Sequence, residues 1–167
     1  MQTKFIDRYL GKELLKDTPP RAVVLYGPRR IGKSTLLEHI VNKSDTRWFN
    51  GDLPGVSEEL NFQTQGDVLN ALLQAKTIVI DEAHKIPNIG RIVKLLVDAN
   101  EKLEEPRQIF ITSSSAFYLI AIKESALGRV VSRQMWPFSL NEIAMDAGWG
   151  KLTENIEHRI VYGMMPL

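Results

Sequence analysis

The 167-residue sequence contains no cysteine, which excludes disulfide scaffolds, thiolate zinc sites and cysteine nucleophiles. It also has little net charge, because 21 Lys and Arg residues are balanced by 20 Asp and Glu residues, which leaves +1. Such a chain has no overall field that attracts nucleic acid or an anionic membrane. No apolar run approaches the roughly 20 residues that span a bilayer, and the N-terminal residues lack the apolar core of a secretory signal. We therefore expect a cytoplasmic protein without a membrane partner.

The composition is that of a folded domain, with 44% hydrophobic and 25% charged residues. Short apolar runs rich in β-branched residues alternate with segments of helical periodicity. Strands are predicted over Ala22–Tyr26, Arg47–Asn50, Thr77–Ile80, Gln108–Thr112 and Val130–Trp136. Helices are predicted over residues 5–14, 33–41, 68–73, 89–103, 116–122 and 152–162. A further helix is predicted to begin at a capping box formed by Ser139 and Glu142. This alternation predicts an α/β fold with a five-stranded, mainly parallel sheet covered on both faces. Ligands of such folds bind at the carboxyl ends of the strands, and the irregular residues 51–66 are expected to form a loop over that site.

A glycine-rich motif directly follows the first predicted strand and precedes a predicted helix. It matches the P-loop pattern G-x-x-x-x-G-K-[ST] and comprises Gly27, Pro28, Arg29, Arg30, Ile31, Gly32, Lys33, Ser34 and Thr35. The glycines permit backbone angles that let successive N–H groups converge on phosphate oxygens at a helix N-terminus. Lys33 is expected to reach the β- and γ-phosphates of a nucleotide, and the Ser34 hydroxyl to bind Mg²⁺. The alternative is a glycine-rich turn whose lysine faces solvent.

Two acidic residues end the third predicted strand, in the sequence TIVIDE of residues 77–82. This is the pattern of a Walker B strand. Asp81 is expected to hold Mg²⁺ directly or through water, and Glu82 to polarise the attacking water. Acids at a strand end can also merely cap the following helix, but their combination with a P-loop favours catalysis.

Hydroxyl side chains end the fourth predicted strand, at Thr112, Ser113, Ser114 and Ser115. If this strand lies between the two motif strands, one hydroxyl would contact the γ-phosphate or the attacking water, as the sensor residue of many P-loop ATPases does. Thr112 and Ser113 are the sensor candidates. Ser114 or Ser115 can equally be the N-cap of the next helix.

Arginines near the last predicted strand are candidates for stabilising the charge that develops on a transferred phosphoryl group. Arg129 is the first candidate, acting on the site of its own chain or of a neighbour, and Arg133 is the second. Solvated or salt-bridged arginines are the alternative for both. Arg29 and Arg30 of the P-loop can face phosphate, a partner subunit or water.

His84 follows Glu82 by two positions, and we expect it to bond with Glu82 rather than to act directly. Residues 81–84 also spell the DEAH box of helicases. Helicases of that type use two RecA-like domains to form the ATP site, whereas this chain has room for one.

The ordered segments GPRRIGKST, IVIDEAHKIPNIG, IFITSSSAF, SALGRVV, WPFSLNEI and YGMMP resemble the prokaryotic AAA+ ATPases, a group allied to the archaeal ATPases and the STAND proteins. The resemblance implies a P-loop NTPase of the RecA/AAA+ type, a three-layer sandwich, with ATP and Mg²⁺ as ligands. It implies further that Gly27–Thr35 bind ATP, that Asp81 and Glu82 form the Walker B pair, that Thr112–Ser115 correspond to sensor 1, and that Arg129 corresponds to the arginine after a Leu-Gly or Ala-Gly step. The family commonly has glutamine at the position of His84.

Members of this group usually carry a C-terminal domain of unknown function, which is often nuclease-like. By this resemblance residues 1–148 form the ATPase core, and residues 149–167 begin a helical lid or a linker to that domain. The chain is therefore expected to be a fragment or a truncated member. Nucleic acid would be bound only through the missing C-terminal domain. Association with further copies of this chain, or with a partner protein, is also a candidate.

The expected function is Mg²⁺-dependent binding and hydrolysis of ATP, with adenine preferred by resemblance. Two alternatives stay open: an ATP-dependent switch or DNA-associated regulatory module with little hydrolysis of its own, and a small-molecule or nucleotide kinase. Against the kinase, the pair Asp81 and Glu82 suits the activation of water, and no arginine-dense lid follows the sensor strand.

Overall fold

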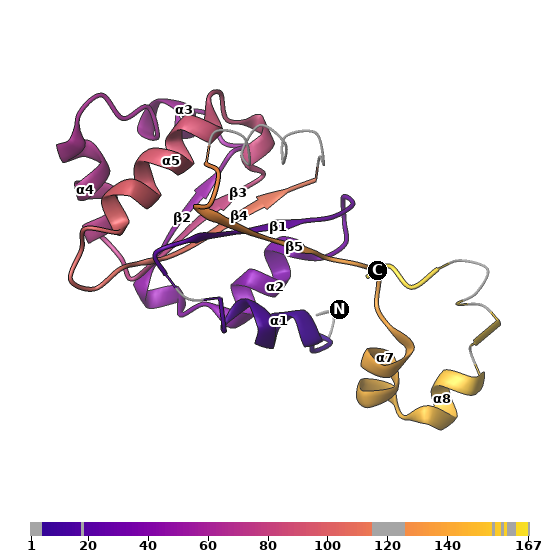
Figure 1. The fold of residues 1–167 in the computed structure, drawn as a ribbon. Coiled ribbons are helices and arrows are strands. Elements are labelled where there is room, and N and C mark those ends of the chain that lie inside the picture. Colours follow the sequence, from indigo (N-terminus) through magenta and orange to yellow (C-terminus); the bar gives the residue numbers. More distant parts are fainter. Residues whose placement is uncertain are drawn as a thin grey trace.

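The computed structural model describes residues 5–17, 19–114, 126–154, 156–157, 159 and 163–166. Five strands form one sheet in the order β2-β3-β4-β1-β5, and each neighbouring pair is parallel (Figure 1). The strands are β1 (Ala22–Tyr26), β2 (Thr46–Asn50), β3 (Thr77–Asp81), β4 (Gln108–Ser113) and β5 (Val130–Gln134). The predicted five-stranded, mainly parallel sheet is therefore confirmed. Strand β4 lies between β1 and β3, as the sensor hypothesis requires.

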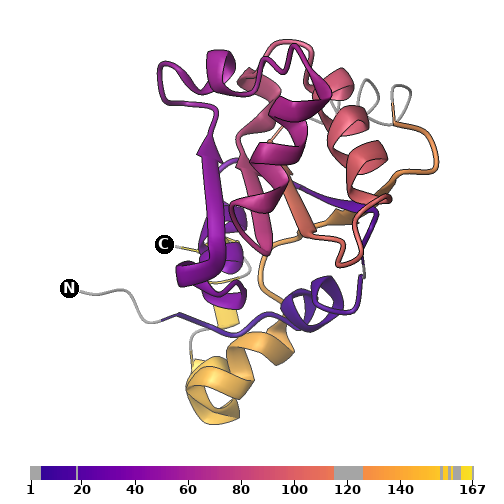
Figure 2. The same cartoon turned by 90° about the vertical axis from the view of Figure 1, so that its left-hand side faces the viewer.

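Helices cover both faces of this sheet. The α-helices of the described residues are α1 (Tyr9–Leu14), α2 (Lys33–Ile40), α3 (Val56–Glu59), α4 (Gln65–Leu73), α5 (Ile89–Asn100), α7 (Leu140–Ala147) and α8 (Trp149–Glu154), and the 3-10 helices are η1 (Lys43–Asp45) and η2 (Ala83–Lys85). Figures 1 and 2 show α3, α4 and α5 on one side of the sheet and α1 and α2 on the other. This is the predicted three-layer sandwich. Among the described residues, no helix has both the length and the apolar character that a membrane crossing requires.

The strands send alternate side chains into two separate cores. On β1, Ala22 and Val24 belong to the core beneath α3, α4 and α5, whereas Val23 and Leu25 belong to the core beneath α1 and α2. All four side chains are fully buried. A strand with both faces covered has no polar side to show, which is why Ala22–Tyr26 reads as a continuous apolar run.

Several helix boundaries differ from the predictions. Helix α4 begins at Gln65, because Thr64 and Asp67 form a capping box ahead of the apolar residues from which the prediction started at 68. The first helix begins at Tyr9, although the apolar periodicity starts at Phe5. Helix α8 begins at Trp149 rather than at residue 152, and residues 156–157 and 159, within the predicted range, are also helical. Ser115, the predicted helix over 116–122, and residues 155, 158 and 160–162 lie outside the described residues.

Residues 51–66 do not form the expected loop over the site. They include α3, and Val56, Leu60 and Phe62 are buried in the core beneath α5. Only the first part of the segment lies beside the motif strands, because the Gly51 N–H donates to the Asp81 carbonyl at 2.9 Å. The apolar side chains of residues 56–62 hold the remainder of the segment against the sheet. Their spacing in the sequence is too irregular to suggest a helix.

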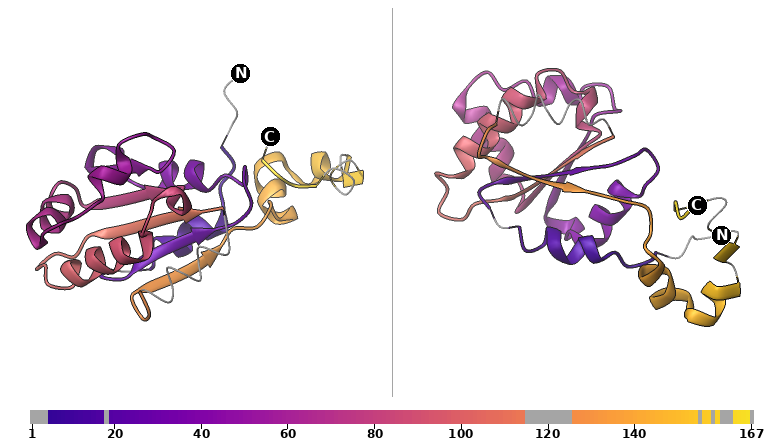
Figure 3. Two further views of the ribbon diagram at one scale, coloured as in Figure 1. Left: turned by 90° about the horizontal axis from the view of Figure 1, so that it is seen from above. Right: turned by 45° about the vertical axis from the view of Figure 1, so that its right-hand side comes forward.

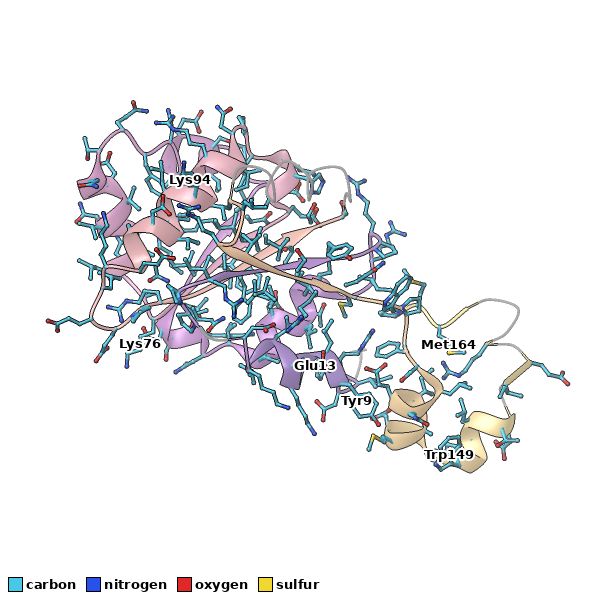
Figure 4. The ribbon with its side chains drawn as sticks, in the orientation of Figure 1. Tyr9, Glu13, Lys76, Lys94, Trp149 and Met164 are labelled. Carbon is cyan, nitrogen blue, oxygen red and sulfur yellow. The ribbon has the colours of Figure 1, made fainter. Side chains whose placement is uncertain are left out.

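Helices α7 and α8 lie beyond the carboxyl ends of the strands (Figures 1 and 3). Ser139 and Glu142 form the predicted capping box of α7. The Glu142 carboxylate also lies 3.3 Å from Arg8 Nε and accepts the Tyr9 N–H at 3.0 Å, and Figure 4 shows Tyr9 at this junction. The Arg8 guanidinium is buried over the Phe138 ring, 4.2 Å from its centre. Residues 8 and 9 thus attach α7 to the body of the protein. A domain boundary near residue 148 stays a prediction.

Candidate functional site

The P-loop connects the carboxyl end of β1 to the start of α2. Gly32 takes φ 92°, in the left-handed region, and is the N-cap of α2, which begins at Lys33. Gly27 lies so close to the chain after β5 that a Cβ would stand 2.5 Å from the backbone oxygen of Met135. Both glycines of the motif are therefore required by the backbone itself. Between them, Arg30 takes φ 61° and is exposed, as is Arg29.

The Lys33 side chain is folded back onto this loop. It is 4% exposed, and its Nζ donates to the carbonyl oxygens of Gly27 at 3.0 Å and Pro28 at 2.9 Å. Burial lowers the pKa of Lys33, while the carboxylates of Glu82 and Asp81 act in the opposite direction. The alternative of a solvent-facing lysine is wrong. Lys33 places a buried cation beside the two acids at the end of β3.

Asp81, the last residue of β3, joins the P-loop to the neighbouring strand β4. Ser34 donates from Oγ to Asp81 Oδ1 at 3.0 Å, and Thr112 donates from Oγ1 to the same oxygen at 2.5 Å. Asp81 is 6% exposed and Thr112 is fully buried. A hydroxyl and a carboxylate are oxygen ligands of the kind that Mg²⁺ prefers, so Ser34 and Asp81 fit this metal. Within the described part of the chain, no group of three or more His, Asp or Glu side chains forms a separate metal site.

The chain turns sharply after Asp81. Glu82 takes φ 49°, and its backbone N–H donates to Thr112 Oγ1 at 2.9 Å. The Thr112 hydroxyl thus accepts from one acidic residue and donates to the other, which fixes both relative to β4. The expected contact between His84 and Glu82 is present, because His84 Nδ1 lies 3.3 Å from Glu82 Oε2.

These contacts bring the two motifs together, and the comparison with known sequences agrees with them. A sequence family described as an AAA domain matches residues 19–144. The chain belongs to this AAA domain family. The resemblance to AAA+ P-loop ATPases is therefore confirmed at the level of the family.

No curated protein matches the sequence of this AAA domain. Among solved structures, it is similar to the Orc1 protein of Aeropyrum pernix in complex with DNA, with a TM-score of 0.50 and 17% sequence identity. The match covers 89% of this chain and 47% of that one, so this chain spans about half the length of the Orc1 protein. At such low identity the likeness concerns the fold alone.

The AAA domain does not bring Arg129 to its own P-loop. Strand β5 runs parallel to β1 and starts at the same edge, where the Ala22 N–H donates to the Arg129 carbonyl at 3.0 Å. The length of β1, at about 3.3 Å per residue, separates this edge from the P-loop by roughly 16 Å. The side chain of Arg129 is paired with Asp98 of α5, and that of Arg133 with Asp17. The prediction that Arg129 completes the site of its own chain is therefore wrong, while a role at a neighbouring copy stays a prediction.

The sensor candidates of this AAA domain lie at the correct edge of the sheet. Ser113 is fully buried, and its carbonyl accepts the Gly27 N–H at 3.3 Å. The Thr112 hydroxyl donates to Asp81, so Thr112 is connected to Ser34 of the P-loop through that carboxylate. Ser114 Oγ lies 3.3 Å from His84 Nε2. That Thr112 or Ser113 senses a nucleotide stays a prediction.

Two neighbours of the P-loop were missed by the sequence analysis. A Cβ at Gly32 would lie 3.6 Å from Pro166 Cγ and 3.7 Å from Met135 Cε. Residues 163–166 return to this edge because the Phe138 N–H donates to the Met164 carbonyl at 3.0 Å, and Figure 4 shows Met164 beyond the end of the sheet. Pro166 belongs to the YGMMP segment, but no spacing rule places so distant a segment beside a P-loop.

A second feature outside the sequence predictions bears on whether adenine or guanine is bound. Residues 42–45, Asn-Lys-Ser-Asp, match the guanine-recognition pattern N-K-x-D. They form η1 and its N-cap at the amino edge of the sheet, immediately before β2. The Asn42 side chain accepts from the Ser44 N–H, and Asp45 accepts from the Lys76 N–H. This motif is therefore a local turn on the edge opposite the P-loop, and it gives no reason to expect guanine.

Proposed function

We propose that this chain binds Mg²⁺·ATP at the P-loop and hydrolyses it. The observation that supports this most strongly is the convergence of Ser34 and Thr112 on one oxygen of Asp81. It brings a P-loop hydroxyl, a Walker B carboxylate and a sensor-strand hydroxyl into direct contact, with the Lys33 cation close by. A P-loop that served only as a turn would need none of these contacts.

The residues of the chain have separate tasks in this proposal. Lys33 and the N–H groups of the loop bind phosphate oxygens, and Lys33 exchanges its present contacts with the carbonyls of Gly27 and Pro28 for phosphate. Ser34 and Asp81 hold Mg²⁺, which when bound neutralises charge on the phosphate oxygens. Glu82, whose side chain is 23% exposed, accepts a hydrogen bond from water and orients it for attack.

A second candidate is an ATP-dependent switch, and the position of Arg129 favours it. An arginine that stabilises the developing charge accelerates hydrolysis by about 10³–10⁵-fold in related reactions. Because Arg129 lies at the amino edge of the sheet, the chain does not supply this group to its own site from that position. A homo-oligomer or a partner protein would then control turnover.

Association with DNA belongs to this second candidate. The Orc1 protein, which shares the fold, is described in complex with DNA. The net charge of +1 gives this chain little attraction of its own for phosphate backbones. We therefore expect no DNA retardation by this chain alone at physiological salt, and a clear shift would contradict that expectation.

Release of inorganic phosphate from Mg²⁺·ATP tests the proposed hydrolysis. We expect release by the unchanged protein, at least about 100-fold less by Glu82→Gln with ATP still bound, and no ATP binding by Lys33→Ala. Lys94→Ala is the matched control, because Lys94 is an exposed lysine of α5, labelled in Figure 4. Equal loss of binding in the Glu82 and Lys33 variants would contradict the roles assigned here. ATP binding without release would favour the switch.

A further inference from the structure

One imidazole ring contacts the ends of both β3 and β4. The chain leaves β3 through Glu82 in the left-handed region and enters the 3-10 helix η2, which carries His84 back toward the site. His84 Nδ1 lies 3.3 Å from Glu82 Oε2, and His84 Nε2 lies 3.3 Å from Ser114 Oγ. The His84 side chain is 11% exposed and that of Glu82 is 23% exposed. A nearly buried ring thus connects the proposed base to the residue that follows the sensor strand.

The two neighbours of the ring lie at different nitrogens. His84 Nδ1 and Glu82 Oε2 are close together but not aligned as a hydrogen bond, so the ring restrains the carboxylate by proximity. Ser114 Oγ and His84 Nε2 are within hydrogen-bond distance, and the tautomer of the ring decides which of them donates. With a neighbour at each nitrogen, the rotation of the ring is restrained.

The backbone keeps Glu82 in the position that this contact requires. A positive φ is uncommon for a residue other than glycine, and the hydrogen bond from the Glu82 N–H to Thr112 holds it there. The glutamate side chain would otherwise rotate freely toward solvent. A general base acts only within hydrogen-bond reach of its proton, and its contacts are often long before the substrate is bound.

We propose that His84 is a positioning residue for Glu82. It restrains the carboxylate that orients water, and it couples that carboxylate to Ser114, so that a shift of β4 changes the position of the base. This inference rests on the proposed hydrolysis. The proposed effect is on turnover rather than on nucleotide binding, because the contacts of His84 with Glu82 and Ser114 act on the residue that orients water.

The test compares His84→Ala, His84→Asn and Ser114→Ala in calorimetric binding of Mg²⁺·ATP and in phosphate release. We expect His84→Ala to lower kcat by about 10-fold to 100-fold, as loss of an orienting partner does elsewhere, with an unchanged Kd. The amide nitrogen of asparagine takes the place of Nδ1, so His84→Asn recovers most of the rate. Ser114→Ala keeps the Glu82 contact and lowers kcat by a few-fold. His39→Ala is the matched control, because His39 is exposed on α2 and stacks on Phe5.

The outcomes separate this inference from the proposed function. Phosphate release by His84→Ala at the unchanged rate would overturn the role of His84 and leave the proposed hydrolysis intact. Loss of ATP binding by His84→Ala in parallel with its loss of rate would show that His84 is merely structural. A His84→Asn variant no faster than His84→Ala would show the same, and either result would overturn the role of His84. Absence of release from the unchanged protein would overturn the hydrolysis itself, and this inference with it.

Discussion

Replacing Thr112 with valine removes a single hydroxyl from a fully buried position and keeps the shape of the side chain. That hydroxyl donates to Asp81 Oδ1 at 2.5 Å and accepts the Glu82 N–H at 2.9 Å. Valine therefore removes the donor that β4 provides to Asp81 and the acceptor that it provides to Glu82. Ser34 continues to donate to Asp81 from the other side.

The expected loss follows from these two contacts. A hydrogen bond to a charged group contributes about 1.5–3 kcal/mol, and a buried N–H left without its acceptor costs about 1–3 kcal/mol. Since the turn at Glu82 can relax in part, we expect Thr112→Val to lower the free energy of unfolding by about 3 kcal/mol. For a chain of this size, that loss lowers Tm by roughly 6–12 °C. Thr112→Ser keeps the hydroxyl and loses one methyl group, which costs about 1 kcal/mol.

Thermal and urea denaturation of both variants without nucleotide provide the measurement. The serine variant is the control for the loss of side-chain volume. A valine variant that melts within about 2 °C of the unchanged protein would refute the reasoning. So would a serine variant destabilised as much as the valine variant, because the effect would then come from packing rather than from the hydroxyl.

Three further predictions concern the loop, the last strand and a helix cap. Gly27→Ala places a Cβ 2.5 Å from the Met135 backbone oxygen and should lower the free energy of unfolding by about 1–3 kcal/mol. The control Gly150→Ala, in open space on α8, should raise the free energy of unfolding by about 0.5–1 kcal/mol. Equal effects of the two substitutions in urea denaturation would contradict the close approach of Gly27 to Met135. Arg129→Ala removes a half-exposed ion pair, so we expect at most about 1 kcal/mol of lost stability and an unchanged Kd for Mg²⁺·ATP; weaker binding would show that Arg129 reaches the site. Backbone N–H groups, that of Thr64 first, hold the pKa of Asp67 below its ordinary 3.8, so the stability from this cap is present above that pH and lost below it. The Tm difference between the unchanged protein and Asp67→Asn should therefore close on acidification, and a constant difference would argue against the cap.

The parts of the site that the sequence predicts are those carried by local pattern. The P-loop and Walker B residues each follow a continuous apolar run, and parallel strands bring such ends to one edge of the sheet. The capping box at Ser139 and Glu142 was equally visible, because its partners are three residues apart. These predictions needed no knowledge of distant packing.

The remaining features depend on strand direction or on distant segments. Arg129 comes directly before a parallel strand, and a residue in that position lies at the amino edge of the sheet, opposite the P-loop. The pair of Arg8 and Glu142, and the approach of Pro166 to Gly32, join segments far apart in the chain. Such contacts arise from tertiary packing and leave no periodicity in the sequence.

Calorimetric titration of Mg²⁺·ATP into the unchanged protein and into Lys33→Ala tests the central claim most directly. The account predicts saturable binding at one site in the unchanged protein, preferred over Mg²⁺·GTP, and its loss in the variant, while both proteins remain folded. Binding of equal strength to both proteins, or no binding to a folded unchanged protein, would contradict an ATP site built from Lys33, Ser34 and Asp81.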